Sequence, residues 1–330
     1  MLKVSVLIPI WNVEKYIERC LRSVFEQTVA DQAEFILVND CSPDNSMKIA
    51  ETVINDYPHL KNQIKVINHE TNRGLAAARI SAFSQAQGKY IINVDSDDWV
   101  EPNYLEELLN AAEREDADVV GCNVVREFGD RTQVFKVPLP SDGKECVRKL
   151  LTGEIQGWLH IKLMKKEVID SNPGDWWVEG LNIWEDLLFS VQFFYYERKI
   201  VYIDKELYHY RQDNTESLTL FYRSPASKKI CINMIGIYFY IEKFLKEKDI
   251  FSEYASELNE RKISVKIYIL TGYSSPQDYF SLYPGLYKSI KIKNLQTLYR
   301  KTLLFLCDCR LYGLVNLILN VKNAVNRLRR

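Results

Sequence analysis

Acidic residues gather at one point of the sequence in a pattern that suits chemistry. Asp95, Asp97 and Asp98 follow an apolar run, Tyr90 to Val94, that has the length and composition of a buried strand. Carboxylates packed this closely repel one another, and a divalent cation between them relieves the repulsion. The run therefore predicts a Mn²⁺ or Mg²⁺ site. The alternative is that these acids cap the helix expected from Pro102 and stay solvated.

A second acidic pair, Glu185 and Asp186, begins the helix expected from Glu185 to Glu197. Two acids at a helix N-terminus are favourable to the helix dipole, and the residues alone favour this simple interpretation. An aromatic loop with Trp176, Trp177 and Trp184 precedes the pair. Flat indole faces stack on the C–H faces of sugars, so the loop is a candidate sugar platform; the alternative is that the indoles belong to the core.

The elements that must position these residues alternate in type over the first 125 residues. Apolar runs of strand length are Val4 to Ile10, Phe35 to Val38, Ile64 to Ile67, Tyr90 to Val94 and Val119 to Val125. Amphipathic helices are expected between them, one of them starting at Ser42 and Pro43 and another at Pro102. Such repeats build a parallel α/β sheet, and ligands of open α/β sheets gather at the carboxyl ends of the strands.

The composition excludes several classes of protein. In 330 residues, 43 basic and 44 acidic residues nearly cancel, so no overall field favours nucleic acid. The seven cysteines are odd in number and form no C-x-x-C pair, which favours a reducing cytoplasm. The N-terminus lacks the features of a signal peptide, and no apolar run reaches the roughly 18 to 20 residues that span a bilayer. We therefore expect a cytoplasmic protein that does not cross a membrane.

Four motifs stand at or just beyond the ends of successive expected strands. They are Ile8-Pro9-Ile10-Trp11-Asn12, Val38-Asn39-Asp40-Cys41-Ser42, Asn72-Arg73-Gly74 with Arg79, and Asp95-Ser96-Asp97-Asp98. In order and spacing they resemble the family 2 glycosyltransferases of the GT-A fold, including those that assemble bacterial surface polysaccharides. The resemblance covers roughly residues 1 to 215 and continues in Trp158 to Leu163, Glu185-Asp186 and Tyr208-His209-Tyr210-Arg211. It implies a Rossmann-like, mostly parallel sheet flanked by helices, and inverting transfer of a sugar to an acceptor hydroxyl.

The resemblance implies which residues bind the nucleotide donor, with a UDP-sugar as the expected donor by family precedent. Pro9, Trp11 and Asn12 would lie against the base, where the indole can stack on uracil; the alternative for Trp11 is core packing. Asp40 matches an aspartate that hydrogen-bonds the base, and its alternative is to cap the helix at Pro43. The preceding family acid is Asn39 here, which leaves the base preference open.

The resemblance also places the loop at Asn72 to Gly74 and the helix after it on the donor side. Asn72 and Gly74 match the loop before the helix, where glycine permits a positive φ and close approach to the donor. Arg79 matches an arginine that points into the nucleotide pocket in relatives, whereas its alternative is a solvated surface position. The asparagine that often follows it in the family is Ile80 here.

The resemblance also implies the catalytic roles. Asp97 would ligate a metal that bridges the donor diphosphate, Asp95 and Ser96 would contact the donor, and Asp95 would also reach the metal. Asp186 would remove the proton of the acceptor hydroxyl, with Glu185 as its orienter. The groups expected to close over the diphosphate are His209, also a candidate metal ligand, and Arg211; the acceptor side would hold Trp158, Trp176, Trp177 and Trp184.

After about Ser224 the chain has helical periodicity throughout, so we expect a GT-A domain over residues 1–215 and an all-helical region over 216–330. From Arg300 onward, apolar residues at helical spacing accompany seven basic residues and one acid, Asp308. Such a helix can lie on anionic lipid, which would suit a lipid-linked saccharide acceptor at the inner face of the cytoplasmic membrane. The alternative is an amphipathic helix packed on its own domain.

The sequence therefore predicts a metal-dependent glycosyltransferase that uses a nucleotide-diphosphate sugar. A sugar-phosphate nucleotidylyltransferase would need a glycine-rich loop after the first strand, and a nicotinamide oxidoreductase would need G-x-G-x-x-G at the same turn; Ile8 to Asn12 contains no glycine. A degenerate, transferase-like scaffold is the remaining alternative. The acids at Asp40, Asp95, Asp97 and Asp186 favour the enzyme.

Overall fold

The structure is a computed structural model that describes residues 2–197, 199–214, 228–272 and 276–328. The chain divides into two compact units, Met1–Ser217 and Leu218–Arg330. The predicted division after residue 215 falls in residues 215–227, outside the described residues.

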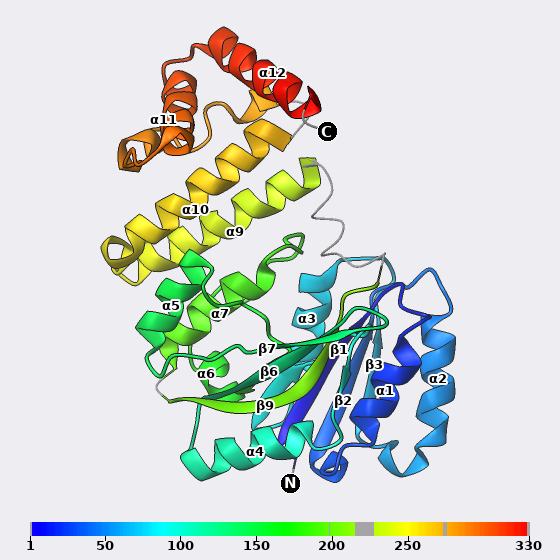
Figure 1. Cartoon of the computed structure of the whole chain (residues 1–330). Helices are drawn as coiled ribbons and strands as arrows, with labels where there is room; N and C mark the ends of the chain where they lie inside the picture. The colour runs from blue at the N-terminus through cyan, green and yellow to red at the C-terminus, as the bar shows by residue number, and fades with distance from the viewer. Residues whose placement is uncertain (1, 198, 215–227, 273–275, 329–330) are drawn as a thin grey trace. The chain divides into compact units, whose positions relative to one another are not determined.

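Unit 1 is built on one mixed β-sheet with helices on both faces (Figure 1). Its strands are β1 (Val4–Ile10), β2 (Ala33–Asn39), β3 (Ile64–Asn68), β4 (Tyr90–Asn93), β5 (Trp99–Val100), β6 (Val119–Glu127), β7 (Thr132–Phe135), β8 (Lys162–Lys165) and β9 (Ile200–Arg211). The order is β3-β2-β1-β4-β8-β6-β9-β5, and β7 pairs with β6. Strands β1 to β4 run parallel, as predicted, whereas β8 is antiparallel to both of its neighbours.

The helices of unit 1 are α1 (Ile17–Phe25), α2 (Ser46–Asp56), α3 (Leu75–Ser84), α4 (Tyr104–Glu115), α5 (Gly143–Thr152), α6 (Lys166–Asp170) and α7 (Glu185–Tyr196). Alternate residues of β1 and β2 pack with α1, α2 and α4 into one large core on one face of the sheet. Helix α3 packs on β1 and β2 as well, and its buried residues lie outside that core. Every residue of β1 is buried, which explains its mostly apolar sequence, and its polar residue Ser5 donates a hydrogen bond to Glu34 at 2.6 Å.

Two predicted helix starts are wrong by a few residues. Helix α2 begins at Ser46 rather than at Ser42 and Pro43, because the Ser42 hydroxyl is used elsewhere. Its oxygen accepts the backbone N–H of Asn12 at 2.8 Å and donates to Asp44 at 2.7 Å. The Asp44 carboxylate in turn accepts the backbone N–H of Ser46 at 3.1 Å, so Asp44 supports the first turn. Helix α4 likewise begins at Tyr104, two residues beyond Pro102.

Unit 2 is helical, as predicted. It contains α9 (Lys228–Glu247), α10 (Phe251–Gly272), α11 (Leu295–Asp308) and α12 (Tyr312–Leu328), with 3₁₀ turns η3 (Pro276–Tyr279) and η4 (Leu286–Ser289). Its second half packs around a core of Ile263, Leu270, Phe280, Leu303, Leu304, Cys307, Val315 and Leu319. Among the described residues, no helix has the length and apolar character needed to cross a membrane.

Candidate active site

The acidic run after β4 lies where the parallel strands β1 and β2 also end. Both carboxylate oxygens of Asp95 contact a basic side chain. One carboxylate oxygen pairs with the Arg79 guanidinium at 3.2 Å, and the other lies 3.1 Å from Nδ1 of His160. Burial raises the pKa of Asp95, but the His160 hydrogen bond and the Arg79 charge outweigh it and hold that pKa well below the ordinary range. Asp95 is therefore ionised at neutral pH.

Asp97 and Asp98 face a different set of groups from the end of β9. Asp98 is buried; its oxygens accept the Tyr208 hydroxyl at 2.7 Å and the Arg211 backbone N–H at 2.8 Å. The Asp97 carboxylate is half-buried and accepts a hydrogen bond from the Asn214 side chain at 2.8 Å. The Arg211 Nε also donates to the Asp97 carbonyl at 3.1 Å. Arg211 thus lies against the Asp97–Asp98 turn, near where the sequence comparison expected it.

The acids of this run carry more negative charge than the nearby groups neutralise. Burial raises the pKa of both Asp97 and Asp98, and the neighbouring carboxylates raise them further. Ligand atoms of Asp95, Asp98 and His160 lie within 4.8 Å of one another, and Nε2 of His160 is buried with no partner among the described residues. Two carboxylates and an imidazole nitrogen are ligands that Mn²⁺ accepts. These three residues fit a divalent cation, whereas Asp97, the ligand that the resemblance implies, is not in this group.

Arg79 connects this acidic run to the pair at the start of α7. Its side chain is 4 % exposed, and its guanidinium contacts both Asp95 and the Glu185 carboxylate. Burial lowers the pKa of Arg79, but the charges of Glu185, Asp95 and Asp186 outweigh it and raise that pKa. Burial likewise raises the pKa of Glu185, and the Arg79 charge opposes the rise. One guanidinium therefore holds the two acidic motifs in a single charge cluster; it is not the solvated surface residue that the alternative required.

The backbone under Asp186 is fixed by residues that sequence reasoning missed. Lys162 is 1 % exposed, and its ammonium donates to the carbonyls of Gln156 and Trp158 at 3.1 and 2.5 Å. Gly157 between them lies so close to α7 that an added Cβ would come within 2.8 Å of the Leu187 nitrogen. Burial lowers the pKa of Lys162 to about 8, and the Asp186 charge opposes this shift. A buried cation thus stands near the predicted base.

The donor-side loop is organised by Asp40. This buried carboxylate accepts the backbone N–H groups of Arg73 and Gly74 at 2.8 and 2.7 Å and also contacts Nδ1 of His69 at 2.7 Å. The Asn72 side chain donates to the Asp40 carbonyl at 3.2 Å. Asp40 therefore shapes the loop before α3 and does not cap α2, whose N-cap is Asn45. Its predicted contact with a base stays a prediction.

Gly74 takes the positive φ that the sequence comparison required, at +90°. An added Cβ would lie 2.3 Å from the side chain of Asn182, which accepts the Ala76 backbone N–H at 2.9 Å. On the outer side, Arg73 pairs with Glu179 through two hydrogen bonds of 2.8 and 2.9 Å. The loop before α3 and the loop before α7 are thus held together.

The residues expected against the base lie at the end of β1. Pro9 pairs in register with Val38 inside the sheet, and Ser96 is buried beside the acids. Trp11 is 42 % exposed, so the core alternative does not apply and its indole is available for stacking. Asn12 adopts a positive φ of 55° and turns the chain away from the strand.

His209 does not lie where the resemblance placed it. It was expected at the diphosphate and the metal, but both of its ring nitrogens contact carboxylates elsewhere, Glu127 at 2.7 Å and Glu101 at 2.8 Å. Its ring stacks on Trp99 at 5.0 Å. Successive residues of a strand point to opposite faces, so Tyr208 reaches Asp98 while His209 points away. The histidine beside Asp95 is His160, whose ring stacks on Tyr208 at 4.4 Å.

The tryptophans differ in burial. Trp177 is buried and packs on Phe189 of α7 at 4.5 Å, so it takes the core role that the sequence left open. Trp176 also packs on Phe189, at 5.3 Å, but is only partly buried. Trp158, which stacks on His160 at 5.7 Å, and Trp184, which immediately precedes Glu185, are partly buried as well. Trp158, Trp176 and Trp184 remain the candidates for an acceptor contact.

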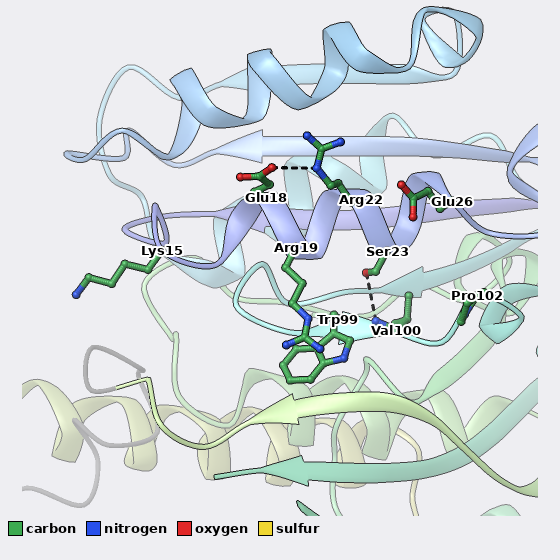
Figure 2. A pocket seen from close by; sticks show the side chains of 9 residues that line it. All are labelled: Lys15, Glu18, Arg19, Arg22, Ser23, Glu26, Trp99, Val100 and Pro102. Carbon is green, nitrogen blue, oxygen red and sulfur yellow. Dashed lines mark hydrogen bonds and ion pairs between the residues drawn. The ribbon is translucent and has the colours of Figure 1, made fainter. Parts of the chain in front are cut away.

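A surface cavity of about 540 Å³ lies between α1 and the edge strand β5, and its lining residue Trp99 directly follows Asp98. Figure 2 shows Arg19 laid over the Trp99 ring at its wall, 3.3 Å from the ring centroid. Neither Asp97 nor Asp186 lines the cavity. The candidate active site is therefore identified by its charged groups and not by this cavity.

An acidic run at the end of β4, joined through one buried arginine to acids at a helix start, defines a GT-A sugar transferase. Comparison with known proteins agrees. The model of "Glycosyl transferase family 2" matches residues 5–172, and the chain belongs to this family and is a glycosyltransferase. EpsH of Bacillus subtilis (strain 168), named as a glycosyltransferase, is 33 % identical over 262 residues, which cover 78 % of this chain and 73 % of EpsH.

Two further relatives extend this comparison. The cholesterol galactosyltransferase of Borreliella burgdorferi is 30 % identical over 269 residues, covering 76 % of this chain and 70 % of that protein. Among solved structures, that of residues 1–349 of S. aureus TarS in complex with UDP-GlcNAc superposes with a TM-score of 0.70 at 20 % identity. It covers 98 % of this chain and 92 % of that one. The GT-A fold predicted from the sequence is confirmed.

Proposed function

We propose that this glycosyltransferase moves a sugar from a UDP-sugar to an acceptor hydroxyl with inversion at the anomeric carbon, and that it depends on a divalent cation. The donor assignment is supported by the UDP-GlcNAc complex of TarS, a protein of the same fold. Inversion and metal dependence are supported by the motifs of this chain and by the charge of its acidic run.

The observation that carries the proposal is the position of Arg79. Because its guanidinium contacts both Asp95 and Glu185, the donor-side acids and the acids of α7 border one site. Asp186 follows Glu185 directly, is half-buried, and has one carboxylate oxygen bound to the Leu187 N–H at 2.8 Å. A base on one side and a cation site on the other are what a single displacement at a sugar carbon needs.

In this proposal each residue of the site has a role in donor binding or in transfer. Trp11 stacks on the base, and the loop ordered by Asp40 lies beside the nucleoside. Asp97 and Asp95 would hold Mn²⁺ or Mg²⁺, which when bound supplies positive charge to the diphosphate leaving group. Asp186 accepts the proton of the attacking hydroxyl, while Glu185, held by Arg79, fixes the start of α7. Arg211, at the Asp97–Asp98 turn, adds a second positive charge on the diphosphate side.

The acceptor and the setting are part of the proposal. We infer a saccharide or lipid-linked saccharide acceptor, with Trp158, Trp176 and Trp184 near it, and a role in bacterial polysaccharide synthesis in the cytoplasm. This proposal is supported by the relatives of the chain, which include TarS of Staphylococcus aureus, named as a poly(ribitol-phosphate) beta-N-acetylglucosaminyltransferase. The basic end with Arg327, Arg329 and Arg330, expected to contact membrane, has side chains outside the described residues.

Thermal unfolding with nucleotides tests the donor and the metal together. A ligand at about 100 times its Kd stabilises the folded state by about 2.7 kcal/mol, so UDP with Mn²⁺ should raise Tm measurably. Asp97→Asn should lose the Mn²⁺-dependent part of this rise, whereas Asp31→Asn, an exposed acid of the same unit, should keep it. If no nucleoside diphosphate raises the Tm of the wild-type protein with or without Mn²⁺, the proposed function is wrong.

A further inference from the structure

Unit 2 displays a short segment of alternating basic and apolar residues, here called the lysine segment, at residues 288–295. Lys288, Lys291 and Lys293 are exposed in it, and so are the apolar side chains of Ile292, 56 % exposed, and Leu295, 83 % exposed. None of these lysines contacts a carboxylate among the described residues. Exposed apolar side chains set among exposed cations are the pattern of a segment that can lie on an anionic interface.

The backbone of the lysine segment is fixed at two points within it. Ile290 is buried in the core of unit 2, as Leu286 is just before the segment, and Lys301 donates to the Ile290 carbonyl at 3.1 Å. Near the end of the segment, the Asn294 side chain caps α11 by accepting the Thr297 N–H at 2.9 Å. The exposed side chains of Ile292 and Leu295 therefore stand on a backbone that is held on both sides of Ile292.

The surroundings of the segment are basic and apolar as well. The sequence contains no acid from Tyr279 to Cys307, and after that only Asp308, against ten basic residues up to the end of the chain. Asp308 turns inward, accepting the Gly285 N–H at 2.6 Å. Helices α11 and α12 (Figure 1) carry further exposed apolar residues, namely Leu298, Phe305, Leu314, Leu317 and Val321.

We propose that the lysine segment docks this protein on an anionic lipid surface, with Ile292 and Leu295 entering the interface and the three lysines meeting the headgroups. A lipid surface offers negative charge and apolar volume together, which matches the segment. A second copy of the chain does not match it, because a two-fold contact would set the same lysines against one another with no acid between them. Nucleic acid would satisfy the lysines but leave the apolar side chains uncovered. The inference concerns unit 2 and does not depend on the proposed transfer reaction.

Vesicle flotation of the full-length protein tests whether the lysine segment binds anionic lipid. The wild-type chain should bind vesicles of 30 % phosphatidylglycerol in phosphatidylcholine, bind pure phosphatidylcholine weakly, and lose binding as salt is added. Replacing Lys291 and Lys293 by glutamine should lower the partition coefficient about 30-fold, at roughly fivefold for each lysine. The matched control replaces Lys48 and Lys61, two exposed lysines of unit 1, by glutamine. Because it removes the same charge outside the lysine segment, it should change the partition coefficient less than about threefold.

A third variant, Ile292→Ser with Leu295→Ser, removes apolar area without changing charge and should also weaken binding. Thermal unfolding checks that all variants stay folded, which is expected since the changed side chains are exposed. Equal losses for the two lysine pairs, equal binding to neutral and anionic vesicles, or no binding by the wild-type chain would each overturn the proposal. A dimer that the Ile292 and Leu295 changes abolish, without vesicle binding, would assign the segment to a second copy instead.

Discussion

Replacing Arg79 by methionine is the sharpest perturbation of the site, because methionine keeps an unbranched apolar stem and removes the guanidinium with its charge. The guanidinium is 4 % exposed and contacts both Asp95 and Glu185. Its loss leaves the buried carboxylate of Glu185 and the partly buried carboxylate of Asp95 without their shared cation. Only His160 still bonds Asp95, and no other basic group contacts the Glu185 side chain among the described residues.

The expected loss of stability follows from this geometry. Removing one partner of a buried ion pair costs about 3 to 5 kcal/mol, since the remaining charge stays buried. Burial already raises the pKa of Glu185, so this acid takes up a proton more readily and part of the cost is avoided. We therefore expect the lower end of the range, a decrease of about 3 kcal/mol in the free energy of unfolding near neutral pH.

The loss should also depend on pH in a definite direction. Without Arg79, burial is opposed less at Asp95 and Glu185, so the pKa of each rises in the folded variant. The folded variant then binds more protons than the folded wild-type protein, while the unfolded chains are alike. By linkage, the stability difference between the two proteins narrows as the pH falls through about 8, the pKa of Glu185 in the wild-type protein.

Arg73→Met is the matched control. Arg73 also makes two hydrogen bonds to a glutamate, Glu179, but this pair is 42 % and 52 % exposed. Exposed pairs contribute about 0 to 1 kcal/mol, so the control should lose less than about 1 kcal/mol at either pH. Urea unfolding of the three proteins at about pH 9.5 and about pH 7 measures these differences. An Arg79→Met loss no larger than that of the control, or one that does not narrow from about pH 9.5 to about pH 7, would refute the reasoning.

Three further predictions concern the surroundings of the site. Between about pH 8 and about pH 10.5, Lys162 is neutral in the folded protein but charged in the unfolded chain, so the free energy of unfolding of the wild-type protein should rise relative to that of Lys162→Met by at most roughly 3 kcal/mol. Urea unfolding across this pH range measures the rise, and curves of unfolding free energy against pH that stay parallel would contradict it. Gly157→Ala should lose about 1 to 3 kcal/mol and lower transfer, because its Cβ meets the α7 backbone, while Gly313→Ala, with open space around it, should be neutral. Trp11→Ala should change stability by less than about 0.5 kcal/mol yet weaken UDP binding about tenfold in calorimetry, as expected for loss of base stacking; unchanged affinity would remove Trp11 from the base site.

Much of the fold could be predicted because its central strands are buried on both sides. The mostly apolar runs at β1, β2 and β4 have the length of buried strands, and their order places the acidic run at the end of β4. The positions of Asp95 and Gly74 follow from this topology, since both stand at the carboxyl ends of parallel strands.

What the sequence could not reveal depends on contacts between distant segments. His160 lies 65 residues from Asp95, and only the pairing of β8 beside β4 brings it there. Lys162 acts on α7 through Gly157, a contact without a local sequence pattern. His209 was misplaced because its role depends on which face of β9 it occupies, and the register with β5 and β6 sets that face.

The central claim is that an acid at the start of α7 serves as the base for a donor bound at the acidic run. Single-turnover transfer by Asp186→Asn, with UDP-sugar affinity measured on the same protein, tests it most directly. Asn keeps the size of the side chain and cannot accept the proton, so transfer should fall about 100-fold or more while donor affinity stays within about threefold of wild type. Wild-type transfer rates in this variant, or loss of donor binding equal to the loss of transfer, would contradict the account.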